Sequence, residues 1–143
     1  MNTVLVLNGP NLSKLGARDP KIYGGIDYSS LVDEVSKEAK LLGIDVDIRQ
    51  SDDETTMIQW IHEAADGNNP VIINAAAFTH YSYAIRDALE ILRSPIIEVH
   101  ISNPLAREEF RHTSVISGVA TGTIAGFGVD SYRLALRALL TIS

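Results

Sequence analysis

Short apolar runs recur along the chain and alternate with more polar segments. They lie at residues 3–7, 44–49, 70–74, 96–101 and about 119–126. The first contains Val4-Leu5-Val6-Leu7, which is apolar without alternation. Such a run is typical of a strand that is covered on both faces of a parallel sheet. The pattern therefore predicts a parallel sheet built from these runs.

The segments between the runs have helical spacing, with apolar residues mostly three or four positions apart. These stripes are Leu31, Val35, Ala39 and Leu42, ending at Gly43; Ile58, Ile61, Ala64 and Ala65; Ile85, Ala88, Leu89 and Leu92; and Leu134, Leu136, Ala138 and Leu140. Ser51-Asp52-Asp53, Thr79 and Asp130 are candidate N-caps of the later stripes, and Asn103-Pro104 predicts a further helix start.

Strand and helix alternate through the whole chain, with short connections. This order predicts a single domain over residues 1–143. The expected fold class is α/β, a flavodoxin-like three-layer fold with a five-stranded parallel sheet in the order 2-1-3-4-5. A chain of 143 residues is long enough to bury a core without disulfide or metal support.

Composition narrows the function mainly by exclusion. There is no cysteine, there are only four histidines, and 12 basic against 18 acidic residues give a formal charge of -6. Thiolate chemistry and disulfides are excluded, a zinc site is disfavoured, and the charge has the wrong sign for nucleic acid. The N-terminus has no signal-peptide pattern and no apolar stretch has the length of a membrane span. We therefore expect a soluble, cytoplasmic protein.

Polar side chains gather where the predicted strands end. Asn8 and Asn11 follow the first run, Asn74 and His80 the third, and His100, Ser102 and Asn103 the fourth, with Arg107 and Arg111 beyond. Open parallel sheets bind ligands outside the carboxyl ends of their strands, so these side chains should converge on one rim.

Each of these residues also has an ordinary structural interpretation. His100 could be a core histidine bonded to Glu98 or to a carbonyl, and the two arginines could pair with Glu108 and Glu109. Tyr23 could cover its neighbours Ile22 and Gly24, Arg18 could pair with Asp19, and Asp87 could be a solvated helix charge. The sequence has no dinucleotide or Walker glycine pattern and no nucleophile elbow. Of the kinds of catalysis considered, acid–base chemistry is the one that these exclusions leave open.

Three blocks of sequence resemble type II 3-dehydroquinate dehydratases, and the resemblance runs over nearly the whole chain. They are Asn8-Gly9-Pro10-Asn11-Leu12-Ser13 with Leu15-Gly16, Arg18-Asp19-Pro20 and Tyr23-Gly24; Asn74-Ala75-Ala76-Ala77-Phe78-Thr79-His80-Tyr81-Ser82; and Glu98-Val99-His100-Ile101-Ser102-Asn103-Pro104 with Arg107-Glu108-Glu109-Phe110-Arg111. Differences from the family pattern occur at Ser13, Asp19, Ala75 and Thr113.

The resemblance implies the reversible trans-elimination of water from 3-dehydroquinate through an enolate, in the shikimate pathway or in quinate catabolism. It implies that Tyr23 is the base, Arg18 the cation beside it, His100 the general acid and Asn11 the holder of a water on the enolate oxygen. The stretch around 18–24 would act as a lid. An ordinary tyrosine keeps its proton up to about pH 10, so holding its anion at neutral pH needs roughly 4 kcal/mol from such a cation.

The resemblance also implies a substrate-binding set, an assembly and the absence of cofactors. The substrate contacts would be Asn74 and the backbone amides of Ile101 and Ser102 for the carboxylate, His80 and Arg111 for hydroxyls, and Asp87 close to a subunit interface. Glu98 would orient His100. The assembly would be a dodecamer, a tetramer of trimers, with no metal and no organic cofactor.

Two other classes of function are weighed against this one. A phospho-receiver would need acidic residues after the first strand, an aspartate after the third and a lysine after the fifth, whereas this chain has Asn8, Asn74 and no lysine beyond residue 40. A flavin carrier would need a hydroxyl-rich phosphate loop after the first strand. Both of these are non-catalytic modules on the same fold; the second class is a catalytically inactive relative that binds a quinate-like acid.

Overall fold

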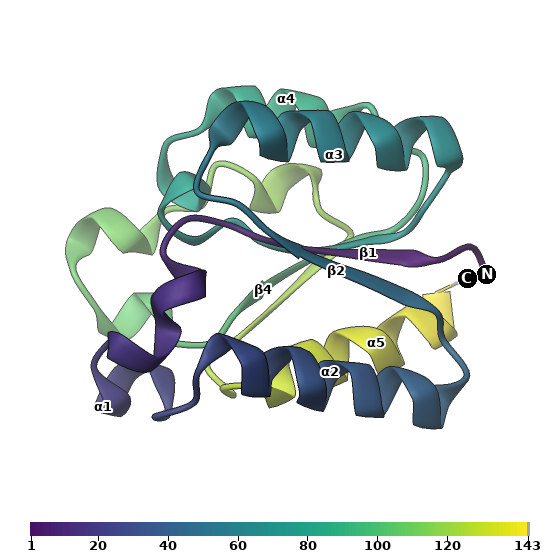
Figure 1. The fold of residues 1–143 in the computed structure, drawn as a ribbon. Helices are drawn as coiled ribbons and strands as arrows, with labels where there is room; N and C mark the ends of the chain where they lie inside the picture. The colour runs from purple at the N-terminus through teal and green to yellow at the C-terminus, as the bar shows by residue number, and fades with distance from the viewer. Residues whose placement is uncertain (143) are drawn as a thin grey trace.

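A computed structural model describes residues 1–142 and places five strands in one parallel sheet (Figure 1). The strands are β1 (Val4–Asn8), β2 (Val46–Gln50), β3 (Val71–Asn74), β4 (Ile96–His100) and β5 (Gly122–Ala125). Their order is β2-β1-β3-β4-β5, and every neighbouring pair is parallel. The predicted α/β flavodoxin-like fold with order 2-1-3-4-5 is confirmed.

Helices cover both faces of the sheet. The α-helices are α1 (Pro20–Tyr23), α2 (Tyr28–Leu42), α3 (Glu54–Gly67), α4 (Tyr83–Glu90) and α5 (Asp130–Ile142). The 3-10 helices are η1 (Leu12–Ala17), η2 (Ala76–His80), η3 (Pro104–Ala106), η4 (Glu109–His112) and η5 (Ser117–Val119). Figure 1 shows α3 and α4 on one face, and α2 and α5 on the other.

The absence of alternation in β1 follows from this three-layer arrangement. Val4 and Val6 belong to the core beneath α2 and α5, whereas Leu5 and Leu7 belong to the core beneath α3 and α4. Successive side chains of a strand point to opposite faces, so a strand between two cores is apolar at every position.

Several predicted helix ends are confirmed, and two predicted caps are wrong. Asp130 is not the residue before α5 but the first residue within it. The α2 stripe ends at Gly43, whose φ is 71°, and Asp53 accepts a hydrogen bond from Thr55 N at the start of α3. Thr79 is not the cap of α4. It lies in η2, and Ser82 caps α4 by accepting from Ile85 N.

Two other local predictions are also corrected. The buried stripe of α5 is Tyr132, Ala135, Leu136 and Leu139, whereas Leu134 and Leu140 are exposed. The prediction of a buried stripe through Leu134 and Leu140 is therefore wrong, because the alternating leucines of this segment do not all lie on one face of the helix. The predicted helix start at Asn103-Pro104 is confirmed: Asn103 caps the single turn η3, which begins at Pro104, and Arg111 lies in a separate turn, η4. The last strand starts at Gly122 because η5 precedes it.

The carboxyl ends of the strands lie at the end of the sheet that is next to α1, and both chain termini lie near the opposite end (Figure 1). None of the helices described within residues 1–142 combines the length and the apolar character needed to cross a membrane. The fold therefore presents one polar rim, on which the strand-end residues meet.

Candidate active site

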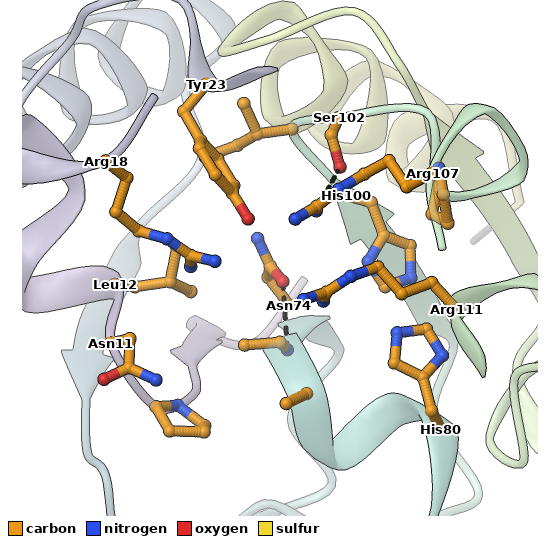
Figure 2. Close-up of a pocket in the computed structure, with 15 residues that line it drawn as sticks. Asn11, Leu12, Arg18, Tyr23, Asn74, His80, His100, Ser102, Arg107 and Arg111 are labelled. Atoms are coloured by element: carbon orange, nitrogen blue, oxygen red, sulfur yellow. Dashed lines mark hydrogen bonds between the residues drawn. The ribbon is translucent and has the colours of Figure 1, made fainter. Parts of the chain in front are cut away.

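A pocket lies on this rim and contains most of the side chains that the sequence indicated (Figure 2). It is concave and opens to solvent, and the space between its walls, part of it open solvent, is about 590 Å³. Its lining residues are Pro10, Asn11, Leu12, Arg18, Tyr23, Asn74, Ala76, Ala77, His80, His100, Ile101, Ser102, Pro104, Arg107 and Arg111. Three arginines and no carboxylate line it, so the pocket is electropositive in a chain whose net charge is -6.

Asn11 reaches the pocket from the turn that follows β1. Its backbone is left-handed, with φ 72°, a conformation that asparagine tolerates better than most residues. Its N–H donates to Asp52 Oδ1 at 2.9 Å, and this bond lowers the pKa of Asp52. The turn is thereby fixed to the loop after β2, and the Asn11 amide is turned toward the pocket (Figure 2).

Tyr23 and Arg18 lie together on the segment between η1 and α2. Asp19 caps the one-turn helix α1 by accepting from Lys21 N, and Tyr23 is its last residue. The Tyr23 side chain is buried, and the Arg18 guanidinium carbon lies 4.1 Å from the ring centroid. Arg18 therefore stacks on Tyr23, and the alternative Arg18–Asp19 ion pair does not form.

Asn74 ends β3, beside Asn8 in the register of the sheet. Its Nδ2 donates to the Tyr132 hydroxyl at 3.0 Å, and its Oδ1 accepts from Ala76 N at 3.2 Å. Ala76 has φ 52°, a left-handed conformation that costs energy for a residue with a Cβ. Backbone strain of this kind is often concentrated at functional sites.

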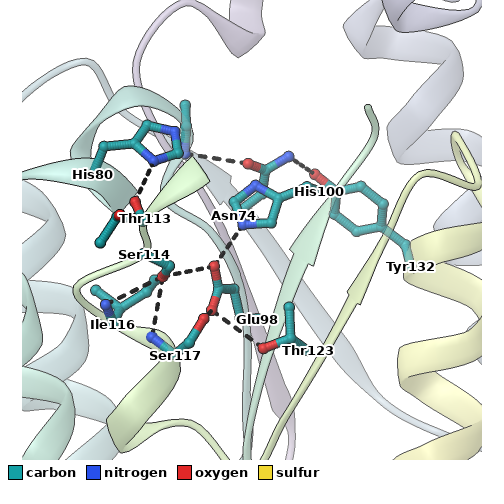
Figure 3. Close-up of polar contacts among 11 residues, drawn as sticks. Asn74, His80, Glu98, His100, Thr113, Ser114, Ile116, Ser117, Thr123 and Tyr132 are labelled. Carbon is teal, nitrogen blue, oxygen red and sulfur yellow. Dashed lines mark hydrogen bonds and ion pairs between the residues drawn. The ribbon is translucent and has the colours of Figure 1, made fainter. Parts of the chain in front are cut away.

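His100 ends β4, and Glu98 lies on the same face of the strand two residues earlier. His100 Nε2 donates to Glu98 Oε2 at 2.6 Å, and both side chains are buried (Figure 3). The carboxylate also accepts from Ser114 at 3.0 Å, Thr123 at 3.3 Å and Ser117. We call these three hydroxyl donors the Glu98 clamp.

The clamp explains how a buried carboxylate keeps its charge. Burial alone raises the pKa of Glu98, but the hydrogen bonds from His100, Ser117 and Ser114 outweigh burial and hold the pKa below its ordinary value. An ionised Glu98 fixes a proton on His100 Nε2 and leaves Nδ1 as the second nitrogen of the ring. The ordinary interpretation of His100, a core histidine bonded to Glu98, thus coexists with a place on the pocket wall.

His80 and Arg111 line the side of the pocket that lies across from Arg18 and Asn11 (Figure 2). His80 Nδ1 donates to the Thr113 carbonyl at 2.8 Å, and burial lowers the pKa of His80. A neutral His80 with its proton on Nδ1 presents Nε2 as an acceptor. Arg111 Nε donates to Glu108 at 3.2 Å, and this pairing still leaves its guanidinium on the pocket wall.

Arg107 belongs to the pocket, although the family motif gave it no role. Its guanidinium carbon lies 5.1 Å from the Tyr23 ring centroid, and Nη1 donates to Ser102 Oγ at 3.1 Å. Its Nε is buried and has no hydrogen-bond partner within residues 1–142. The ordinary interpretation of Arg107, an ion pair with a neighbouring glutamate, is confirmed in part: its Nε lies 3.8 Å from Glu108 Oε1, while the side chain stays on the pocket wall.

Asp87 is the one residue expected to contact substrate that the described chain leaves outside the pocket. It lies on α4, is exposed, and pairs with Arg86 at 3.0 Å. Ile101, in contrast, is buried on the pocket wall directly after β4. Over residues 1–142 no three His, Asp or Glu side chains are grouped closely enough to hold a metal ion. The side chains present can exchange protons and bind an anion.

The matches to known proteins cover nearly the whole chain. The sequence model of a family described as dehydroquinase class II matches residues 2–140. The chain is 56% identical over 135 residues to the 3-dehydroquinate dehydratase of Mycobacteroides abscessus, and 94% of each chain is covered. It is 55% identical over 136 residues to the 3-dehydroquinate dehydratase of Salinispora tropica, with 95% of each covered. The crystal structure of type II dehydroquinase from Propionibacterium acnes matches with a TM-score of 0.95 and 54% identity, covering 99% of this chain and 97% of that one.

Proposed function

The chain belongs to the dehydroquinase class II family, and from that premise we propose that it catalyses the reversible dehydration of 3-dehydroquinate. The enzyme would be a hydro-lyase. One observation carries the proposal: a buried tyrosine with two guanidinium groups at its ring and a buried histidine–glutamate pair both border one electropositive pocket.

The lining of the pocket suits an anionic substrate. A carboxylate would be attracted by the arginines, with no acidic side chain on the wall to repel it. We assign the substrate carboxylate to Asn74 and the backbone amides of Ile101 and Ser102, and the ring hydroxyls to His80 and Arg111.

Proton abstraction is assigned to Tyr23. Its phenolate would take the proton next to the ketone, forming an O–H bond as the C–H electrons move into an enolate. Arg18 and Arg107 place positive charge beside this tyrosine, with their guanidinium carbons 4.1 Å and 5.1 Å from the ring centroid. Asn11 would hold a water molecule that donates a hydrogen bond to the enolate oxygen.

Proton donation is assigned to His100, which Glu98 orients. The enolate electrons re-form the ketone and expel the β-hydroxyl, which takes a proton from His100 and leaves as water. The cycle ends with a neutral tyrosine and a neutral histidine. Solvent then removes the proton from Tyr23 and returns one to His100, so the two residues need no other partner to reset.

We also propose that residues 18–24 close over bound substrate as a lid.

A separate proposal concerns the assembly, in which twelve chains would form a tetramer of trimers. Two features support an assembly: Asp87 is exposed in the single chain, and Tyr83 on the same helix is 68% exposed. An assembly would let Asp87 act at a neighbouring subunit's pocket. Native mass spectrometry would show the dodecamer directly, and a monomer that is active at nanomolar concentration would refute it.

The decisive assay is absorbance at the wavelength of the conjugated enone after mixing purified protein with 3-dehydroquinate. We expect a rise that survives a chelator and pretreatment with borohydride and substrate, because neither a metal nor a Schiff base takes part. If the protein binds quinate tightly but gives no rise, it is instead a binding relative of the family.

A further inference from the structure

One buried tyrosine lies outside the pocket lining but is hydrogen-bonded to a residue that lines the pocket. Tyr132, on α5, is fully buried between the ends of β1 and β3. Its hydroxyl donates to Asn8 Oδ1 at 2.6 Å. It accepts from Asn74 Nδ2 at 3.0 Å (Figure 3). Asn8 and Asn74 lie side by side in register, so the hydroxyl bridges two neighbouring strand ends.

The direction of each hydrogen bond follows from one backbone donor. The N–H of Ala76 requires an oxygen, which is Asn74 Oδ1, so the NH₂ group of that amide must face Tyr132. The tyrosine hydroxyl accepts from this NH₂, and its single proton therefore goes to Asn8 Oδ1. Burial raises the pKa of Tyr132, so the hydroxyl remains a donor at any working pH.

One N–H of Asn74 stays unused in this arrangement. Within residues 1–142 its Nδ2 has Tyr132 as its hydrogen-bond acceptor and no second one, and Asn74 lines the pocket (Figure 2). We propose that Tyr132 is a positioning residue that sets the amide orientation of Asn74, so that the free N–H points to the carboxylate of the substrate. The inference rests on the proposed function, because that function supplies the carboxylate.

The test is Tyr132→Phe, which removes one oxygen and keeps the ring in the core. If the carboxylate contact is equally strong in the ground and transition states, KM should rise about five- to tenfold with kcat within about twofold. In calorimetry the Kd of quinate should rise by a similar factor, whereas the Kd of its uncharged methyl ester should stay within about twofold. A general loosening of the fold would weaken both ligands alike, and that outcome would overturn the proposal.

Tyr28→Phe is the matched control. Tyr28 accepts a hydrogen bond from the other end of the Asn8 amide at 3.5 Å, makes no hydrogen bond to Asn74 and does not line the pocket. It should leave both Kd values unchanged. An equal loss of quinate affinity in Tyr28→Phe and Tyr132→Phe would mean that orientation of Asn74 is not the cause.

Asn8→Leu gives the same test if Tyr132→Phe does not fold. It removes Asn8 Oδ1, which accepts the hydroxyl proton of Tyr132. That proton then competes with the Asn74 NH₂ group for the space between the two side chains. Unchanged quinate affinity in a folded variant would refute the positioning role. If the wild-type protein binds quinate but does not convert 3-dehydroquinate, the proposed reaction fails while the quinate and ester titrations still decide the role of Tyr132.

Discussion

The two walls of the pocket are held in different ways. On the strand side, Asn74 and His100 end β3 and β4, and hydrogen bonds fix both side chains to buried partners. On the loop side, Arg18 and Tyr23 stack on each other, and within residues 1–142 neither the guanidinium nor the phenol group makes a hydrogen bond. Buried hydrogen bonds fix the strand wall, whereas stacking and the apolar packing of the Tyr23 ring hold the loop wall.

This difference separates the proposed acid from the proposed base. The acid side is preorganised, because the orientation of His100 is fixed before any substrate arrives. The base side consists of one-turn helices and a stacked pair, so small changes of backbone can move it. The contrast predicts that substitutions on the strand wall change chemistry and core stability together, whereas those on the loop wall change chemistry alone.

Tyr23→Phe should have the largest effect. It removes the oxygen that would accept the proton and keeps the ring between the two arginines. We expect kcat to fall on the order of 10³-fold or more, as for loss of a general base, with quinate affinity nearly unchanged. Steady-state kinetics and calorimetry measure the two quantities. Activity comparable to that of the wild type would remove Tyr23 as the base.

Glu98→Gln should have the next largest effect and should act on both catalysis and stability. The replacement presents an NH₂ group to donors that need an acceptor, namely the clamp hydroxyls and His100 Nε2. We expect kcat to fall about 10²-fold and the free energy of unfolding to fall by about 1–3 kcal/mol. A variant as active and as stable as the wild type would mean that the carboxylate has no role in either.

Acid sensitivity gives a second test of Glu98. The folded-state pKa of Glu98 lies below its ordinary value of 4.5, so the carboxylate stabilises the fold above about pH 4.5. That contribution is lost as the pH falls through the lower folded value. Urea midpoints at pH 7 and pH 4 should therefore differ less for Glu98→Gln than for the wild type. An equal or larger difference in the variant would contradict the sign of this shift.

The sequence predicts the residues of the strand wall better than it predicts the hydrogen-bond partners that fix them. Apolar runs place Asn74 and His100 at strand ends, and period-two alternation puts Glu98 on the same face as His100. The partners that fix them come from distant segments: Ser114 and Thr123 for Glu98, and Tyr132 for Asn74. No local pattern encodes pairs separated by 16, 25 or 58 residues.

Local sequence patterns do not predict the residues of the loop wall. The family motif identified Arg18 and Tyr23, and nothing in their spacing predicts that they stack. Arg107 lost its place in the prediction because adjacent charges usually pair in solvent. Arg107 lies between the turns η3 and η4, where its Nη1 donates to Ser102 Oγ at 3.1 Å, and no local pattern predicts this contact.

Arg18→Ala should have a smaller effect. It removes the guanidinium that lies closest to the Tyr23 ring, at 4.1 Å, and with it a positive charge that would stabilise the negative charge developing in the transition state. We expect kcat/KM at pH 7 to fall about tenfold. Arg107→Ala should lower it less, because its guanidinium is farther from the ring, at 5.1 Å against 4.1 Å. Arg137→Ala is the control of equal charge, since Arg137 on α5 pairs with Glu38 on α2, away from the pocket. Unchanged kcat/KM in Arg18→Ala would place the activating cation elsewhere.

Gly24→Ala should have the smallest effect and separates the two regions most cleanly. Gly24 ends α1 with φ 80°, Gly43 ends α2 with φ 71°, and in neither place would an added Cβ meet an atom within 4 Å. Both substitutions therefore carry only the left-handed backbone cost, about 1 kcal/mol. In Gly24→Ala that cost should fall on the closed form of the loop wall and lower kcat/KM about threefold to fivefold, with little change in melting temperature. In Gly43→Ala it should fall on a helix of the core and lower the melting temperature by a few degrees without changing kcat/KM. Equal thermal shifts in the two variants would mean that the loop wall unfolds with the sheet and is not a separate, movable part.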